Sequence, residues 1–236
     1  MSPFTFTSTK TIAEGAGVKV LCYGNSGIGK TRLCATAPAP LILSAEGGML
    51  SLREYDIPVV VIDSVETLLS VNEWCYTSPD ANNFQTICLD TISEIAEVIL
   101  TNAKLSLNDG RQAYGELAEK MMQIIKSFRD LPYHNVYFSC KLGRDNDPHT
   151  GAMLYGPSLP GKILTQGIAY HFDEVFKLDA ATDTKGNEYN YLLTKGDQQN
   201  IAKDRSGSLL PQEYPDLSNI FNKIKSATQP NPTETN

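Results

Sequence analysis

A glycine-rich loop near the amino terminus constrains this chain more than any other feature. The residues Gly24-Asn-Ser-Gly-Ile-Gly-Lys30-Thr31 satisfy the pattern GxxxxGK[ST] in full. An apolar run (Val18–Tyr23) leads into the loop, and a predicted helix (Lys30–Ala37) follows it. A loop in this setting wraps a polyphosphate with its backbone N–H groups. The sequence therefore predicts a nucleoside triphosphate site built from Gly24, Asn25, Ser26, Gly27, Ile28, Gly29, Lys30, Thr31 and Arg32.

Within this loop, we expect Lys30 to neutralise the β- and γ-phosphates and the Thr31 hydroxyl to bind Mg²⁺. The ion needs a second protein ligand, a carboxylate at the end of a neighbouring strand. Two candidates follow apolar runs, Asp63 and Asp90. Asp90 is favoured because its run is short and fully apolar and a strong helical pattern follows. Asp63 also opens a helix, and an N-cap role explains it equally well.

A third carboxylate, Glu46, follows the apolar run Leu41–Ser44 and precedes two glycines. A carboxylate at the carboxyl end of a strand beside the phosphate loop is well placed to orient an attacking water. The alternative is a solvated loop glutamate with no catalytic role, and position alone does not decide between them.

The pattern of the whole chain predicts an α/β fold, a mainly parallel twisted sheet flanked by helices. Short apolar runs, typical of strands buried on both faces, alternate with amphipathic helical patterns. One helical face carries Ile92, Ile95 and Ile99, and another carries Leu117, Met121 and Phe128. The predicted strands are Val18–Tyr23, Leu41–Ser44, Val59–Ile62, Thr86–Leu89, Val136–Ser139, Glu174–Leu178 and Tyr189–Leu193.

At 236 residues the chain has room for one domain of ordinary size, which we place at residues 16–225. Residues 1–15 are a Thr/Ser-rich lead-in with an expected edge strand. Residues 226–236 read as a disordered polar tail. No apolar run approaches the ~18 residues that span a bilayer, and the scattered cysteines show no CxxC spacing. We therefore expect a soluble, cytoplasmic protein with no membrane partner.

The net charge of −7 argues against a protein coated in positive charge. Any contact with nucleic acid must therefore be confined to particular loops.

Taken together, these motifs resemble the RecA-fold family, in particular the compact phage recombination ATPases of the single-strand annealing (Sak) type that consist of a RecA core alone. The resemblance runs from about Lys19 to Gly207. Ser-Ala-Glu46-Gly-Gly resembles the family's catalytic glutamate, and Leu-Asp90-Thr-Ile resembles its Mg²⁺-site aspartate. Ser139, Cys140 and Lys141 stand where the family places a polar sensor residue, and all three remain candidates.

The resemblance also implies two DNA-binding loops. Gly110–Phe128 looks like the helix after the first loop, and residues 143–160 look like a mobile second loop. Aromatic and basic side chains in such loops stack on bases and contact phosphates in single-stranded DNA. The candidate contacts are Arg111, Tyr114, Lys141, Arg144, Tyr155 and Lys162.

Finally, Lys203-Asp-Arg205 resembles the K-x-R finger with which ring and filament ATPases reach the γ-phosphate bound by a neighbouring subunit. A solvated turn is the alternative. A finger that acts in trans implies a homo-oligomer, a ring or a filament.

The resemblance thus implies a Mg²⁺- and ATP-dependent recombination protein, acting in the cytoplasm of a bacterial host, that binds single-stranded DNA and promotes annealing or strand pairing. It would work through its own loops or with a single-strand DNA-binding protein. One alternative is an ATP-switched accessory module, such as a helicase loader or a packaging factor, with hydrolysis indifferent to DNA. A small-molecule kinase is disfavoured because no arginine cluster forms a lid.

Overall fold

A parallel β-sheet forms the centre of the protein in the computed structural model, which describes residues 4–107, 109–146 and 151–227. Six strands pair in parallel in the spatial order β3-β2-β4-β5-β1-β7. Four further strands (β6, β8, β9 and β10) join by antiparallel pairing. The strands are β1 (Lys19–Gly24), β2 (Pro40–Ser44), β3 (Val59–Val61), β4 (Thr86–Asp90), β5 (Asn135–Asn146), β6 (Met153–Ser158), β7 (Glu174–Thr182), β8 (Glu188–Leu193), β9 (Lys203–Asp204) and β10 (Gln212–Glu213).

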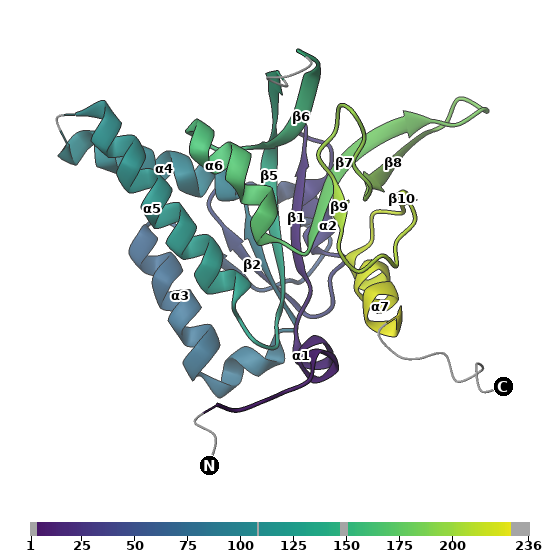
Figure 1. Cartoon of the computed structure of the whole chain (residues 1–236), viewed down its shortest axis with the longest axis horizontal. Coiled ribbons are helices and arrows are strands. Elements are labelled where there is room, and N and C mark those ends of the chain that lie inside the picture. Colours follow the sequence, from purple (N-terminus) through teal and green to yellow (C-terminus); the bar gives the residue numbers. More distant parts are fainter. Residues whose placement is uncertain (1–3, 108, 147–150, 228–236) are drawn as a thin grey trace.

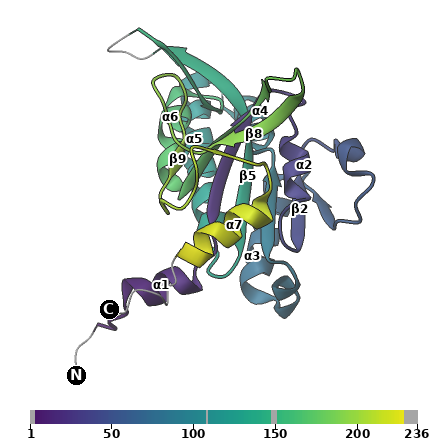
Figure 2. The same ribbon diagram turned by 90° about the vertical axis from the view of Figure 1, so that its right-hand side faces the viewer.

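Helices cover both faces of the sheet (Figures 1 and 2). One face packs against α3 (Val65–Thr77), α4 (Ile92–Ser106), α5 (Gly110–Arg129) and α6 (Lys162–Gly167). The other face packs against α2 (Lys30–Cys34) and α7 (Leu217–Ala227). Short 3-10 turns complete the described fold: η1 (Met49–Leu52), η2 (Pro79–Asn83) and η3 (Ile168–His171).

Strand β1 connects the two hydrophobic cores. Its side chains alternate between the faces of the sheet: Leu21 and Tyr23 join the core under α3–α6, and Val20 and Cys22 join the core under α2 and α7. All six residues of β1 are buried, as expected for a central strand of a parallel sheet. The continuous apolar run in the sequence reflects this burial on both faces.

The predicted fold class is confirmed, and each of the seven predicted strands is present. Six lie within four residues of their expected bounds, whereas β5 runs seven residues beyond its expected end at Ser139. The helix expected over Lys30–Ala37 is shorter, because α2 ends at Cys34 and the chain continues as turns. All five cysteines are buried and free.

Two expectations were wrong. The lead-in holds the helix α1 (Thr9–Gly15) rather than an edge strand, since the Ser8 hydroxyl caps the N–H of Thr11 and Lys10 pairs with Glu14 one turn later. The expected irregular loop over 143–160 is mostly a β-hairpin of β5 and β6, although residues 147–150 lie outside the described part. Gly143 faces Gly156 across this hairpin, and a Cβ at Gly143 would come within 2.9 Å of Ser158 Cβ.

The sequence pattern did not lead us to predict helix α7, although Leu217, Ile220, Phe221 and Ile224 have helical spacing. The polar residues between them and the tail after it obscured the pattern. The last two residues of α7 fall in the expected tail, of which residues 228–236 lie outside the described part. None of the helices in the described ranges combines the length and the apolar character needed to cross a bilayer.

The packing of α7 yields a stability prediction. Phe221 is 2% exposed, so Phe221→Ala removes a buried ring and leaves a cavity. We expect the free energy of unfolding to fall by about 3 kcal/mol in urea titrations. The neighbouring exposed residue provides the control: Asn222→Ala should change it by less than about 0.5 kcal/mol. Equal stability of both variants would contradict the docking of α7 on the sheet.

Candidate active site

The carboxyl ends of four adjacent parallel strands bring the predicted site residues together. Strand pairing places Ser44 of β2 opposite Asp90 of β4, and Gly24 of β1 opposite Lys141 of β5. Polar side chains that follow these strands therefore meet at one edge of the sheet. Sites of this kind are typical of open α/β sheets.

The phosphate loop (Gly24–Thr31) leaves β1 and enters α2. Gly27 and Gly29 have positive φ values of 75° and 110°, a backbone region in which L side chains are strained. Lys30 lies under the loop, and its Nζ donates to the carbonyl oxygens of Gly24 and Asn25 at 2.9 and 2.8 Å. Burial lowers the pKa of Lys30, and the nearby Asp90 and Glu46 carboxylates oppose that shift.

Asp90 receives two hydroxyl hydrogen bonds at the floor of the site. Thr31 Oγ1 donates to Asp90 Oδ2 at 2.7 Å, and Ser139 Oγ donates to Oδ1. The Asp90 side chain is 1% exposed, and the peptide bond to Thr91 is cis. The competing candidate, Asp63, is exposed and accepts from Thr67 Oγ1, beside the N-cap of α3. That hydrogen bond contributes most to lowering the pKa of Asp63. The geometry thus favours Asp90 over Asp63 as the partner of Thr31.

Glu46 lies at the mouth of the site in the loop after β2. Its Oε1 accepts from Thr91 Oγ1 at 3.0 Å, and its side chain lines the same cavity as the phosphate loop. Thr91 also caps the N-terminus of α4. The carboxylate of Glu46 is therefore oriented by a group that is itself anchored to a helix.

A cavity of about 400 Å³ opens between the phosphate loop, Glu46 and the end of β5. Of the three candidates for a polar sensor, Lys141 alone lines this cavity among the residues that the structure describes. Ser139 is engaged by Asp90, and the Cys140 thiol is buried next to Ser93 and Ser158. Lys141 Nζ pairs with Glu94 at 2.9 Å, which raises the pKa of the lysine.

A second cavity of about 720 Å³ lies on the other side of the phosphate loop, and Gly27, Gly29 and Arg32 line both. Three tyrosines border it: Tyr55, Tyr189 and Tyr214. Asn190 Nδ2 donates to the carbonyl oxygen of Ile28 at 2.9 Å and so joins β8 to the phosphate loop. Sequence reasoning missed these residues, since no motif marks them and the fold alone brings them to the loop.

The residues present fit a nucleoside triphosphate with Mg²⁺. Three cations (Lys30, Arg32 and Lys141) and the loop amides face an anion site, and the Thr31 hydroxyl and Asp90 carboxylate supply the oxygen ligands that Mg²⁺ prefers. Within the described ranges, no group of three His, Cys, Asp or Glu side chains forms a metal cage.

The predicted finger residues lie far from the phosphate loop of their own chain. In β9, Lys203 and Asp204 pair with Val175 and Glu174 of β7, and Glu174 pairs with Val20 of β1. Gly24 lies four residues further along β1, about 13 Å away at the usual rise of a strand. Lys203 Nζ donates to the carbonyl oxygens of Ala169 and Phe172 at 2.9 and 2.6 Å.

Arg205 is exposed and makes one ion pair, with Asp173 at 3.1 Å. Because its side chain is 61% exposed, the pair contributes little to stability and leaves the guanidinium accessible to another molecule.

The candidate DNA contacts fall into two groups. Arg111 and Tyr114 are exposed in the first turns of α5, where the Lys104 ammonium lies 5.4 Å from the centre of the Tyr114 ring. The ring also packs near Gly161, the residue before Lys162. The start of α5 therefore lies next to the start of α6.

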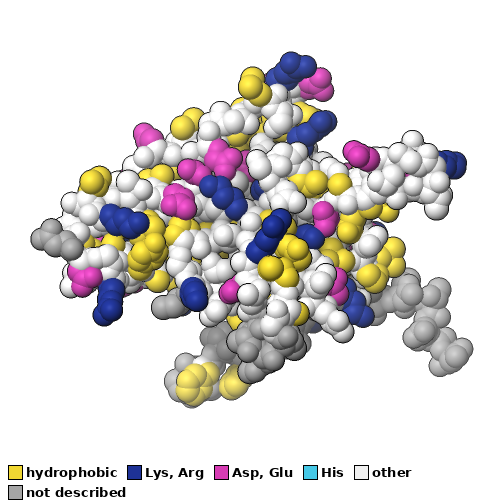
Figure 3. Space-filling view, turned by 90° about the horizontal axis from the view of Figure 1, so that it is seen from above, with side chains coloured by type: hydrophobic (Ala, Val, Ile, Leu, Met, Phe, Trp, Pro, Cys, Tyr) yellow, Lys and Arg dark blue, Asp and Glu magenta, His cyan; other side chains and the backbone are white. Residues whose placement is uncertain are grey.

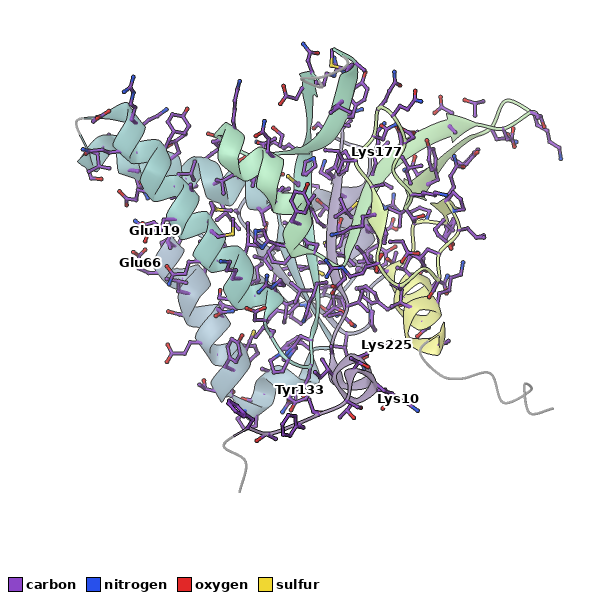
Figure 4. The ribbon with its side chains drawn as sticks, viewed as in Figure 1. Lys10, Glu66, Glu119, Tyr133, Lys177 and Lys225 are labelled. Atoms are coloured by element: carbon purple, nitrogen blue, oxygen red, sulfur yellow. The ribbon has the colours of Figure 1, made fainter. Side chains whose placement is uncertain are left out.

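The second group belongs to the β5–β6 hairpin and α6. Arg144 and Tyr155 are cross-strand partners, and the Arg144 guanidinium lies 5.7 Å from the centre of the Tyr155 ring. Lys177 of β7 approaches the same ring at 5.2 Å (Figure 4). Arg144 and Lys162 line a groove of about 590 Å³ between the hairpin and α6. Lys141 is separate from this group, because its ammonium faces Glu94 and the phosphate cavity.

The position of Lys141 yields a binding prediction. A γ-phosphate in the cavity would compete with Glu94 for this ammonium, so we expect Lys141→Ala to weaken ATP binding by about 5- to 10-fold, as the loss of one charge-assisted hydrogen bond does. Titration with a fluorescent ATP analogue in the absence of DNA measures this affinity. The matched control is Lys185→Ala, an exposed lysine in the turn between β7 and β8, which should bind as the wild type does. Unchanged affinity in Lys141→Ala would mean that Lys141 stays with Glu94.

The chain was compared with known families, curated proteins and solved structures. The crystal structure of a KaiC-like protein from the hyperthermophilic archaeon Pyrococcus horikoshii OT3 is similar, with a TM-score of 0.44 and 16% sequence identity over 75% of this chain and 78% of that chain. No curated protein matches the chain. A family model described as an AAA domain matches residues 16–206, a span that contains every predicted site residue. The chain therefore belongs to this AAA domain family, and it is a P-loop ATPase.

Proposed function

We propose that this ATPase assembles into a ring or filament that binds single-stranded DNA and promotes annealing or strand pairing. The observation that carries the proposal is the separation between the phosphate loop and the finger segment. Lys203 and Arg205 lie toward the opposite ends of the strands from Gly24, so they can meet a bound phosphate only on another subunit. Hydrolysis is then completed between protomers.

The residues at the carboxyl edge suit ATP hydrolysis. Glu46, held by Thr91, accepts the proton from a water whose oxygen attacks the γ-phosphorus, and the bond from that phosphorus to the oxygen of ADP breaks. Lys30 and the loop amides hold the phosphates. Thr31 and Asp90 would hold Mg²⁺, which when bound neutralises charge on the β- and γ-phosphates. The neighbouring subunit's finger adds positive charge where negative charge develops.

The second cavity suits the nucleoside part of the substrate. It adjoins the phosphate cavity at Gly27, Gly29 and Arg32, and its tyrosines offer flat apolar surfaces to a base. Its volume of about 720 Å³ lies in the usual range for small-molecule sites.

DNA binding is supported by the shape and charge of one surface. The β5–β6 hairpin projects from the top of the sheet, and its groove holds two cations, Arg144 and Lys162, with one nearby anion, Asp145 (Figure 1). In the upper face seen in Figure 3, Lys and Arg side chains mix with Asp and Glu. Weak binding by each subunit gives a high overall affinity when many linked subunits bind one strand, because each bound subunit raises the effective concentration of DNA at the next site. The mixed surface equally suits the ATP-switched accessory module, which remains the second candidate.

The first experiment is steady-state ATP hydrolysis with and without single-stranded DNA at low and high salt. We expect single strands to stimulate turnover, and salt to weaken the stimulation because phosphate contacts release counterions. Glu46→Gln should reduce the turnover number by about 100-fold or more and leave ATP affinity nearly unchanged, since it removes the base and keeps the shape. Slow turnover that ignores DNA would favour the accessory module.

A mixing experiment tests the finger in trans. Lys30→Ala subunits cannot hydrolyse ATP but retain the finger, and Arg205→Ala subunits retain the phosphate site. We expect each variant alone to be nearly inactive, whereas an equimolar mixture recovers part of the wild-type rate, because the finger of one completes the site of the other. A mixture no more active than the sum of its components would exclude the finger role, provided that light scattering shows that both variants assemble.

A further inference from the structure

A buried carboxyl group lies directly behind the finger segment and has no role in the steps above. Glu174, the first residue of β7, is 1% exposed, and its Oε2 has no hydrogen-bond partner among the described residues. A lone ionised carboxylate at such a site would carry a large desolvation cost. Its protonation state is therefore set by the groups around it.

The nearest such group is another carboxyl. Asp204 of β9 is the cross-strand partner of Glu174, so the two carboxyl groups lie on the same face of the strand pair and close enough to share a proton. Asp204 also accepts from Ser206 Oγ at 2.6 Å and from the N–H groups of Gly207 and Leu209 at 3.0 and 2.9 Å. These three donors stabilise the ionised form of the Asp204 carboxylate. The proton shared by the two carboxyl groups therefore lies on Glu174.

The pKa values point the same way. Burial, and then the charge of Asp204, raise the pKa of Glu174 to about 8. Burial alone would raise the pKa of Asp204, but hydrogen bonds from Ser206, Leu209, Glu174 and Gly207 lower it. The pair therefore carries one proton near neutral pH.

The other charged groups around Glu174 have partners of their own. On β9 and beyond, Lys203 donates to carbonyl oxygens and Arg205 pairs with Asp173, the residue before Glu174. On β1, Lys19 donates to the carbonyl oxygens of Leu131 and His134. Asp173 lies close enough to add a small upward contribution to the pKa of Glu174. These cations are held elsewhere and do not neutralise an ionised Glu174 through a direct pair.

We propose that the neutral carboxylic acid of Glu174 donates its proton to Asp204 and thereby fixes residues 203–209, which carry the finger, against β7. Glu174 is thus a positioning residue for Arg205, and the segment loosens when Glu174 loses its proton to solvent. A role of this contact in ATP hydrolysis depends on the proposed function of Arg205 as a finger in trans. The contact between Glu174 and Asp204 is independent of that proposal.

The sign of the pH dependence follows from the raised pKa. The folded protein keeps this proton up to about pH 8, whereas the unfolded chain releases it near pH 4.5. The stabilisation is complete below about pH 4.5 and is lost as the pH rises through about 8. Relative to Glu174→Gln, whose amide stays neutral and can still donate to Asp204, the wild type should lose stability across this window.

Hydrogen exchange tests the contact directly, with protection factors measured over residues 203–209 at about pH 6.5 and about pH 9.5, on either side of the pKa. In the wild type, protection at Gly207 and Leu209 should fall about tenfold or more at the higher pH, because about 1.5 pH units of deprotonation permit a loss of up to about 30-fold. In Glu174→Gln, the protection factors at these two residues should differ by less than about twofold between the two pH values. Glu119→Gln, an exposed carboxylate of α5, is the matched control and should behave as the wild type does (Figure 4).

Infrared spectroscopy supplies a second measurement that does not depend on how well the variant folds. The carbonyl band of a protonated carboxylic acid should be present in the wild type at neutral pH and vanish near pH 9.5. Protection that is unchanged with pH in the wild type, or that falls equally in Glu174→Gln, would overturn the proposal, as would the absence of the protonated band.

ATP hydrolysis separates this proposal from the proposed function. If both hold, the Arg205-dependent part of hydrolysis falls through about pH 8 in the wild type and not in Glu174→Gln. If protection follows the expected pattern but Arg205→Ala hydrolyses ATP normally, the contact is supported and the finger role fails. If Arg205 is required but protection ignores pH, the finger role is supported and the assignment to Glu174 fails.

Discussion

Parallel pairing of β1 with its neighbours is the constraint on which the rest of the structure depends. Because β1 pairs with β5 on one side and β7 on the other, the end of β1 must lie beside Lys141 of β5, and the start of β7 must lie beside the start of β1. The first pairing builds the phosphate site at one edge of the sheet. The second places the finger segment toward the opposite edge, on β9.

One residue of β1 connects these two regions. Tyr23, the last residue before the phosphate loop, is buried and donates from its hydroxyl to the carbonyl oxygens of Tyr155 and Ile201, at 3.1 and 2.8 Å. Tyr155 belongs to the β5–β6 hairpin, and Ile201 leads into β9. Tyr23 therefore connects the start of the phosphate loop to the hairpin and to the segment that leads into β9. Lys141 makes a second connection, since it begins the hairpin and lines the phosphate cavity.

Charge is handled differently at the two edges of the sheet. At the carboxyl edge, Lys30, Lys141 and Glu46 line an open cavity that a charged ligand can fill. At the other edge, Lys19 and Glu174 are buried by the protein itself. Lys19 donates to backbone carbonyl oxygens, and Glu174 lies beside the carboxyl group of Asp204. The first arrangement suits catalysis. The second makes packing sensitive to proton loss, because burial disfavours the charged form of a carboxyl group.

Much of the fold and of the phosphate site followed from local pattern. The loop from Gly24 to Thr31 has a fixed length and needs particular residues, and Asp90 and Glu46 directly follow apolar runs, so short stretches of sequence identified them. Helix α7 and the β5–β6 hairpin were harder, since polar residues and glycines mask their periodicity and their apolar faces are defined by packing against distant elements.

The sequence by itself determined the strand–loop–helix unit, the burial of the central strands and the class of ligand, because these depend on residue spacing within a few turns of chain. Only the tertiary structure decided that Lys141 rather than Ser139 or Cys140 faces the cavity, that three tyrosines border a second cavity, and that Glu174 meets Asp204. The physical reason is that strand order and register bring together residues that lie far apart in the chain, and no local pattern records which strands will be neighbours.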